Sequence, residues 1–221
     1  MIEVNTFNFL RDLAAHNDRE WFALNKEKHD IAKENLINFT SKIITGLSKI
    51  DKAIPPDINP KNCVMRIYRD VRFSLDKTPY KTNFAAGISP NGKNFNGPGY
   101  YLHINPQECF IAGGYWMPEV NHLRLIRQEI DYNPAVFKES LKLLSKINPK
   151  ACLDKNHTLK TAPKGYSPDH PEIEFIKLKS FTVTVPIKYR ELMAPGAETK
   201  VLNGFASIYP FILFLRNALS H

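Results

Sequence analysis

Arginine is concentrated in one short stretch of the sequence, where it alternates with other side chains. Within residues 64–73, Arg66, Tyr68, Asp70 and Arg72 occupy every second position. In a β-strand, alternate side chains project from the same face at a spacing of about 6–7 Å, so this pattern predicts a row containing two guanidinium groups and a phenol. Guanidinium groups bind carboxylate or phosphate oxygens through paired hydrogen bonds. The stretch therefore predicts an anion-binding sheet face, with phosphate as the favoured anion.

The segment that follows would complete such a site. Residues 74–82 add hydroxyl groups and two lysines, whose charges sit on flexible stems. The predicted ligand-binding residues are Arg66, Tyr68, Arg69, Arg72, Ser74, Lys77, Tyr80, Lys81 and His103. The same pattern also fits a solvated sheet face on which Asp70 pairs with a neighbouring arginine.

Asp70 and His103 are the candidates for proton transfer. Tyr101, His103 and Asn105 alternate as the arginines do, so they would share one strand face. A histidine beside a carboxylate can act as a general base, which would make the protein a metal-independent phosphoester hydrolase or transferase. A strand histidine can equally be a hydrogen-bonded structural residue, so the sequence leaves enzymatic activity open.

The positive charge of the chain is unevenly distributed. The sequence has 30 Lys+Arg against 22 Asp+Glu, a formal net charge of +8. Residues 60–81 and residues 142–179 each carry four more basic than acidic side chains. Basic patches attract acidic partners, so a phosphate-bearing small molecule or a nucleic acid is expected. A third hypothesis is therefore a non-catalytic module that docks a nucleic acid or an acidic protein; the sequence does not specify an oligomeric state.

Residue spacing disfavours several other kinds of site. Cys63, Cys109 and Cys152 form no CxxC pair and match no zinc pattern, so no metal is predicted. The glycine-rich phosphate-loop and dinucleotide motifs are absent from the sequence, and no cofactor is predicted. The sparse cysteines favour a reducing compartment, the N-terminus does not resemble a signal peptide, and the apolar stretch 205–215 is too short to span a bilayer. We therefore expect a cytoplasmic protein with no membrane partner.

Helical periodicity dominates both ends of the sequence. The apolar pattern predicts one helix near residues 7–14 and a long second helix that begins at a capping box of Asn17 and Glu20 and ends near residue 50. Further helices are predicted over residues 117–131, 134–146 and 197–219. A short helix is predicted to start at a second capping box of Asp169 and Glu172 and to run through residue 178.

The centre of the sequence has the alternation of β-strands. Strands are predicted over residues 64–73, 84–89, 100–104, 109–113 and 180–185. In the first of these, Met65, Ile67, Val71 and Phe73 would share one face with Arg69. Because no helix separates the central strands, the sheet should be mainly antiparallel. The expected fold is a single α+β domain over residues 1–221, with a central sheet flanked by N-terminal, middle and C-terminal helices.

Several segments together resemble a known family. They are Phe9-Leu10 with Leu13, Asn17–Lys26, Arg66–Ser74, Asp76–Thr82, Tyr100–Ile104, Gly113-Gly114, Pro163–Tyr166 and His170-Pro171. In these segments the chain resembles the domain of unknown function 2461, over nearly its whole length. The resemblance implies one family-sized domain and brings no established activity, substrate or catalytic residue.

Overall fold

A five-stranded antiparallel sheet forms the centre of the structure, a computed structural model that describes residues 1–220. Its strands lie in the order β1 (Phe84–Ile88), β2 (Gly99–Ile104), β3 (Cys109–Tyr115), β5 (Phe181–Ile187) and β4 (Cys152–Leu153). All four neighbouring pairs are antiparallel. The predicted α+β class, with a central antiparallel sheet and flanking helices, is confirmed.

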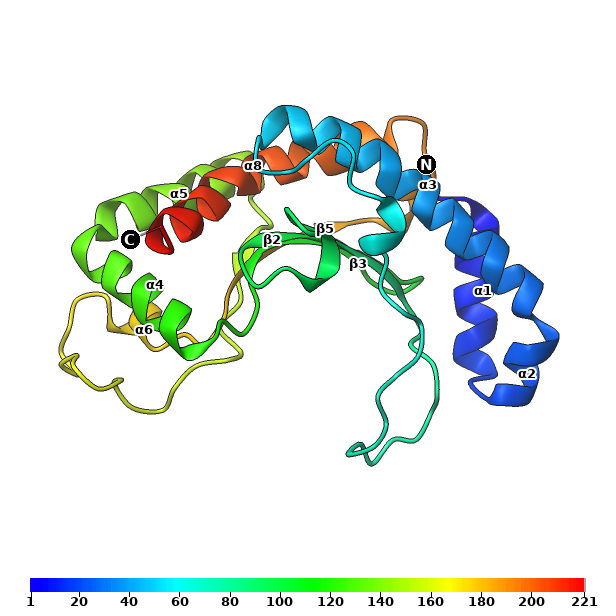
Figure 1. The fold of residues 1–221 in the computed structure, drawn as a ribbon, viewed down its shortest axis with the longest axis horizontal. Coiled ribbons are helices and arrows are strands. Elements are labelled where there is room, and N and C mark those ends of the chain that lie inside the picture. Colours follow the sequence, from blue (N-terminus) through cyan, green and yellow to red (C-terminus); the bar gives the residue numbers. More distant parts are fainter. Residues whose placement is uncertain (221) are drawn as a thin grey trace.

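Helices cover one face of this sheet (Figure 1). Two long helices, α3 and α8, contact each other above it, and α8 also contacts β3. α1 and α2 pack on α3 at one end, while α4, α5 and α6 form the other end (Figure 1). The helices are α1 (Val4–Ala15), α2 (Arg19–Leu24), α3 (Lys26–Ile50), α4 (Val120–Tyr132), α5 (Pro134–Ile147), α6 (Ile173–Ile176), α7 (Tyr189–Met193) and α8 (Ala197–Ala218), with short 3₁₀ turns η1 (Pro60–Asn62) and η2 (Gly92–Asn94).

Alternating strand residues separate the buried face of the sheet from its open face. On β2, Tyr100 and Leu102 are buried under the helices, whereas Tyr101 and His103 are half-buried on the opposite face. α8 lies so close to the sheet that a Cβ added at Gly204 would come 2.1 Å from the Ile111 side chain. The helix layer thus fixes the sheet from one side and leaves the other side free.

A buried polar network joins the two long helices to β2. Asp51, at the C-terminal end of α3, is 1% exposed. It accepts hydrogen bonds from Arg216 Nη1 on α8 at 2.7 Å and from the Tyr100 hydroxyl at 2.9 Å. Because a buried carboxylate is costly without such partners, the network specifies how α3, α8 and β2 meet.

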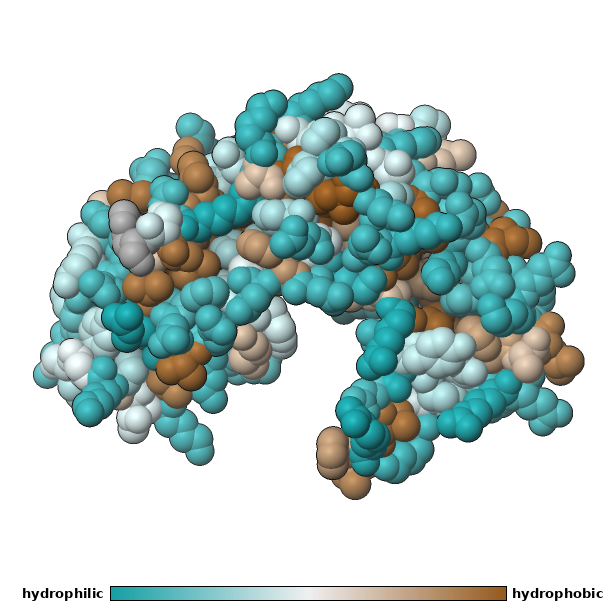
Figure 2. Space-filling model, in the orientation of Figure 1, coloured by the Kyte–Doolittle hydropathy of each residue, from teal (hydrophilic) through white to brown (hydrophobic). Residues whose placement is uncertain are grey.

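The open face is the floor of a hollow. Residues 66–80, here called the arm, project below the sheet beside α1 and α2, and the loop before α6 hangs below the opposite end (Figure 1). The space-filling view shows a wide recess between these two projections (Figure 2).

The predicted strand over residues 64–73 is wrong. Only two isolated bridges form, between Val64 and Ala86 and between Tyr68 and Tyr80, and the chain then turns away as the arm. Phe73, expected at the end of this strand, is 96% exposed. Aspartate side chains compete with a strand ladder, since they accept hydrogen bonds from their own local backbone. Asp76 does this in the arm by accepting from the Thr78 N–H at 2.9 Å.

The predicted helix start at Asn17 is displaced by one residue, and the long helix is broken. Asp18 is the N-cap of α2 and accepts from the Trp21 N–H at 2.8 Å. The Asn17 side chain instead bonds both backbone groups of Tyr80, at the base of the arm. The helix stops at Asn25, whose side-chain amide donates to the Trp21 carbonyl, and α3 begins one residue later.

Near the C-terminal half, the second predicted capping box does not form. The Glu172 carboxylate is bound by Lys138 at 2.5 Å, and the Glu172 N–H donates to the His170 ring. The resulting helix α6 has only four residues. The pattern-based assignment also missed β4 and α7, which are too short to establish a period.

Candidate functional site

The two arginines predicted to form the core of the site do not act together. Arg72 binds Asp70 through two side-chain hydrogen bonds of 2.9 and 2.7 Å, in the exposed part of the arm. This interaction lowers the pKa of Asp70. Arg66 forms no salt bridge within residues 1–220. The predicted row of guanidinium groups is therefore split into one neutralised and one available charge.

Arg69 and Lys77 are also used inside the arm. Arg69 Nη1 lies 2.5 Å from the Asp76 carboxylate and bonds the Thr78 hydroxyl. The Thr78 backbone N–H and Arg69 together hold the pKa of Asp76 at about 2. Lys77 Nζ donates to the Val71 carbonyl at 3.0 Å. These contacts, with the Asp70–Arg72 pair, hold the arm in shape.

Asp70 and His103 do not form an acid–base pair. Asp70 is occupied by Arg72, whereas His103 Nδ1 lies 3.4 Å from the Tyr101 hydroxyl and 3.5 Å from the Asn83 amide. The His103 ring stacks on Phe110 at 4.6 Å, and burial lowers the pKa of His103. No hydrogen bond joins Asp70 to His103 among the described residues.

A pocket of about 500 Å³ opens where Arg66 leaves the sheet. We call it the cation pocket, because four basic side chains from four separate segments line it: Lys33 of α3, Lys61 of η1, Arg66 of the arm and Lys93 of η2. None of the four is in a salt bridge within residues 1–220, although Lys93 Nζ donates to the Asn62 carbonyl at 3.3 Å. Asp30 and Glu34 also line the pocket, but Asp30 is already bound to Lys26 at 2.8 Å. The pocket therefore has an excess of positive charge.

Lys81 adds a further charge beside this pocket. Its backbone N–H donates to the Ile67 carbonyl at 2.7 Å, which brings residue 81 alongside the start of the arm. Burial, and then the charge of Arg66, lower the pKa of Lys81. Two of the predicted basic residues, Arg66 and Lys81, are thus brought close together by the structure.

His29 is the titratable group buried in the wall of the cation pocket. Its Nδ1 lies 2.8 Å from the Asp30 carboxylate, and its ring packs against Phe22 at 5.1 Å and Phe9 at 5.7 Å. Burial lowers the pKa of His29, and the hydrogen bond with Asp30 partly opposes this effect. A neutral His29 therefore lies among the unpaired cations.

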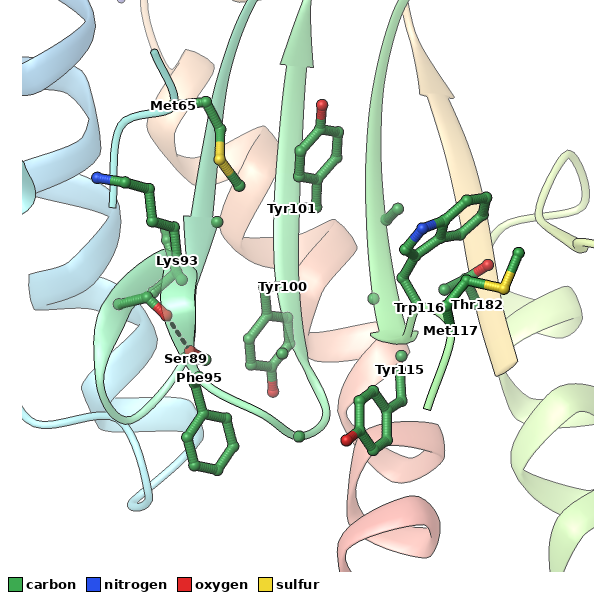
Figure 3. Close-up of a pocket in the computed structure, with 18 of the residues that line it drawn as sticks. Met65, Ser89, Lys93, Phe95, Tyr100, Tyr101, Tyr115, Trp116, Met117 and Thr182 are labelled. Atoms are coloured by element: carbon green, nitrogen blue, oxygen red, sulfur yellow. Dashed lines mark hydrogen bonds between the residues drawn. The ribbon is translucent and has the colours of Figure 1, made fainter. Parts of the chain in front are cut away.

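A second recess, of about 620 Å³, lies on the open sheet face; we call it the sheet cleft. Met65 and Lys93 line both the sheet cleft and the cation pocket, so the two spaces adjoin. Figure 3 shows Met65 and Lys93 on one side of Tyr101, with Trp116 and Met117 on the other. Met117 has φ of +44°, the one non-glycine residue among those described with a positive φ. Such strained backbone is common at functional sites.

The remaining predicted ligand residues have different positions. Tyr68 lines the cation pocket. Tyr80 is buried and stacks on Phe22 at 4.1 Å, while Ser74 belongs to the arm. Sequence patterns missed His29, Lys33 and Lys93, because they are distant from Arg66 in the chain and become its neighbours only through the fold. Lys61 belongs to the basic block of residues 60–81 but lies outside the alternating stretch 64–73.

The three cysteines are free thiols at separate positions. Cys63 and Cys109 are buried and Cys152 is exposed. Burial raises the pKa of Cys63 to about 11, so its thiolate is strongly disfavoured. Among residues 1–220, no group of three or more His, Cys, Asp or Glu side chains is arranged to hold a metal ion.

Comparison with known proteins identifies the family without adding an activity. No curated protein and no solved structure matches the chain. None of the helices described in residues 1–220 has the length and apolar composition to cross a membrane. The family described as "Conserved hypothetical protein (DUF2461)" matches residues 5–214 of 221. Because this match covers almost the entire chain, the protein belongs to the DUF2461 family of conserved hypothetical proteins.

Proposed function

We propose that the protein binds a phosphate-bearing ligand in the cation pocket. One observation carries the proposal: Lys33, Lys61, Arg66 and Lys93 converge on one pocket without salt-bridge partners in the part of the chain that the structure describes. Like charges held close together repel each other, and a bound anion offsets that repulsion. Arginine supplies a planar fork for phosphate oxygens, and lysine supplies a compact mobile charge.

The shape of the site favours a small ligand over the other hypotheses. A recessed pocket supports a small-molecule site more than a flat docking surface for a protein. The separate partners of Asp70 and His103 give no support to a hydrolase that depends on that pair. For the cellular setting we propose the cytoplasm, on the basis of the few and unpaired cysteines in the sequence.

The proposal is tested by calorimetric titration with inorganic pyrophosphate. Arg66→Ala should weaken binding roughly tenfold, since hydrogen bonds to charged groups contribute about 1.5–3 kcal/mol. Arg72→Ala is the matched control: it removes the same charge from the same arm, but from a residue that is paired with Asp70 and does not line the pocket. Its affinity should stay within about twofold of the wild type.

Two results would contradict the proposal. One is a wild-type protein that binds neither pyrophosphate nor a phosphate monoester. The other is equal weakening by Arg66→Ala and Arg72→Ala, which would indicate general attraction by the positive surface.

A further inference from the structure

A row of residues on the open face of the sheet forms the floor of the sheet cleft, and its shape is suited to a flat ring. Gly87, Tyr101, Ala112 and Thr184 lie directly opposite one another on β1, β2, β3 and β5. Tyr101 is the large member of this row, and its two neighbours carry no side chain or a single methyl group. A planar group can therefore approach the sheet beside the Tyr101 ring over Ala112, whereas Met65 lies over Gly87 on the other side.

The walls of the sheet cleft are aromatic or thioether groups. Met65 and Trp116 flank Tyr101 on its two sides, as Figure 3 shows, and Phe95 and Phe110 complete the apolar lining. Aromatic side chains stack on flat rings, and methionine packs well against ring edges and faces. The position of Met65 depends on the glycine below it, because a Cβ at Gly87 would come 3.0 Å from Met65 Cε.

Polar groups line the β5 side of the sheet cleft. Thr182, Thr184 and Asp154 all line it there. The Thr184 hydroxyl lies 3.1 Å from Cys152 Sγ and retains further hydrogen-bonding capacity. A hydrocarbon chain would bury these groups without partners, whereas the edge of a heterocycle offers donors and acceptors to them.

We propose that the sheet cleft is the base-binding half of a nucleotide site, whose phosphates lie in the cation pocket. The inference rests on the proposed phosphate binding and specifies the ligand as a nucleoside phosphate. The two spaces adjoin at Met65 and Lys93, which supports one ligand that extends across both. A cleft of about 620 Å³ is within the size range of small-molecule sites, and it matches a mononucleotide better than a long strand.

The test compares ligands that share phosphate and differ in the attached group. Calorimetry on the full chain would use inorganic pyrophosphate, ribose 5-phosphate, octyl phosphate, and the diphosphates of adenosine and uridine. We expect at least one nucleoside diphosphate to bind at least tenfold more tightly than pyrophosphate, a difference of about 1.4 kcal/mol. Ribose 5-phosphate should show no comparable gain.

Two cleft variants with opposite steric effects separate the two halves of the site. Tyr101→Ala removes the stacking surface, and Ala112→Leu fills the floor beside it. Each should bring the affinity for the nucleoside diphosphate down to that of pyrophosphate and leave pyrophosphate binding unchanged. Arg66→Ala should weaken both ligands by the same factor. Circular dichroism and thermal unfolding would verify that each variant is folded.

The outcomes distinguish failure of this inference from failure of the proposed function. Pyrophosphate binding without any gain from a base would overturn the nucleotide assignment and leave phosphate binding in place. An equal gain for octyl phosphate would overturn it in favour of an apolar chain. Failure of every phosphate ligand to bind would remove both proposals.

Discussion

The availability of a charged side chain depends on its partners, and here the partners differ between neighbouring arginines. Arg66 and Arg72 have the same chemistry and lie on the same arm. Arg72 has an aspartate two residues away and binds it with both ends of its guanidinium fork. Arg66 instead lines a pocket with three lysines, of which Lys33 and Lys93 come from distant segments. The pairing of Arg72 with Asp70 can be read from the local sequence, whereas the pocket around Arg66 is visible only in the folded chain.

His29 should make anion binding depend on pH. Burial lowers the pKa of His29, so the ring is neutral at pH 7. A bound anion favours the protonated ring, and affinity should therefore rise, by up to about tenfold, as pH falls from 7 towards 5. Sulfate is the appropriate probe because its charge does not change in this range; binding would be followed by chemical-shift titration.

Two histidine variants test this prediction, one at His29 and a control at His103. His29→Gln should abolish the rise in sulfate affinity at low pH. His103→Gln should retain it. His103 is half-buried and also has a lowered pKa, but it does not line the cation pocket. A wild-type profile without pH dependence, or loss of the rise in both variants, would contradict the role of His29.

At the scale of elements, backbone contact between β3 and β5 requires glycine at one position. Gly114 has φ of +134°, and an added Cβ would lie 2.0 Å from the Phe181 carbonyl oxygen. Gly165 also has a positive φ, of +96°, but nothing lies within 4 Å of an added Cβ. An added Cβ would therefore cause only backbone strain at Gly165, but both strain and steric overlap at Gly114.

Replacement of these glycines by alanine should have unequal costs. Gly165→Ala should lower the free energy of unfolding by about 1 kcal/mol, the cost of an unfavourable φ. Gly114→Ala should lower it by about 3 kcal/mol or more, since β5 must move to remove the overlap. Urea denaturation of both variants measures the difference, and equal losses would show that β5 yields easily at this position.

Secondary structure was predictable wherever one period extended over a full element. The hairpin of β2 and β3, the helix α5 and the C-terminal helix α8 all follow their sequence patterns closely. The arm did not, since its alternation of charged and apolar residues is that of a strand. Local bonds such as Arg69 to Asp76 hold it as a projecting turn instead. The cation pocket was only partly predictable, because three of its four basic residues lie outside the arginine-rich stretch.

At the scale of the whole molecule, the net charge of +8 has two different contributions. One part gathers in the cation pocket, and another lies in residues 142–179, where some lysines are paired, such as Lys155 with Glu174. Positive charge on both sides of the recess can attract any polyanion weakly. A specific small ligand should instead use the four pocket cations alone.

Salt dependence separates these two modes of binding. For a single-stranded 20-nucleotide DNA held only by the cation pocket, at most four phosphates are neutralised. The logarithm of its affinity should then fall with the logarithm of salt concentration with a slope no steeper than about −3, from roughly −0.7 per phosphate. A nucleoside diphosphate should also compete with this DNA, because both need the same pocket. A slope near −6 would show that the strand also contacts basic side chains outside the cation pocket, and would identify a more extended nucleic-acid interface.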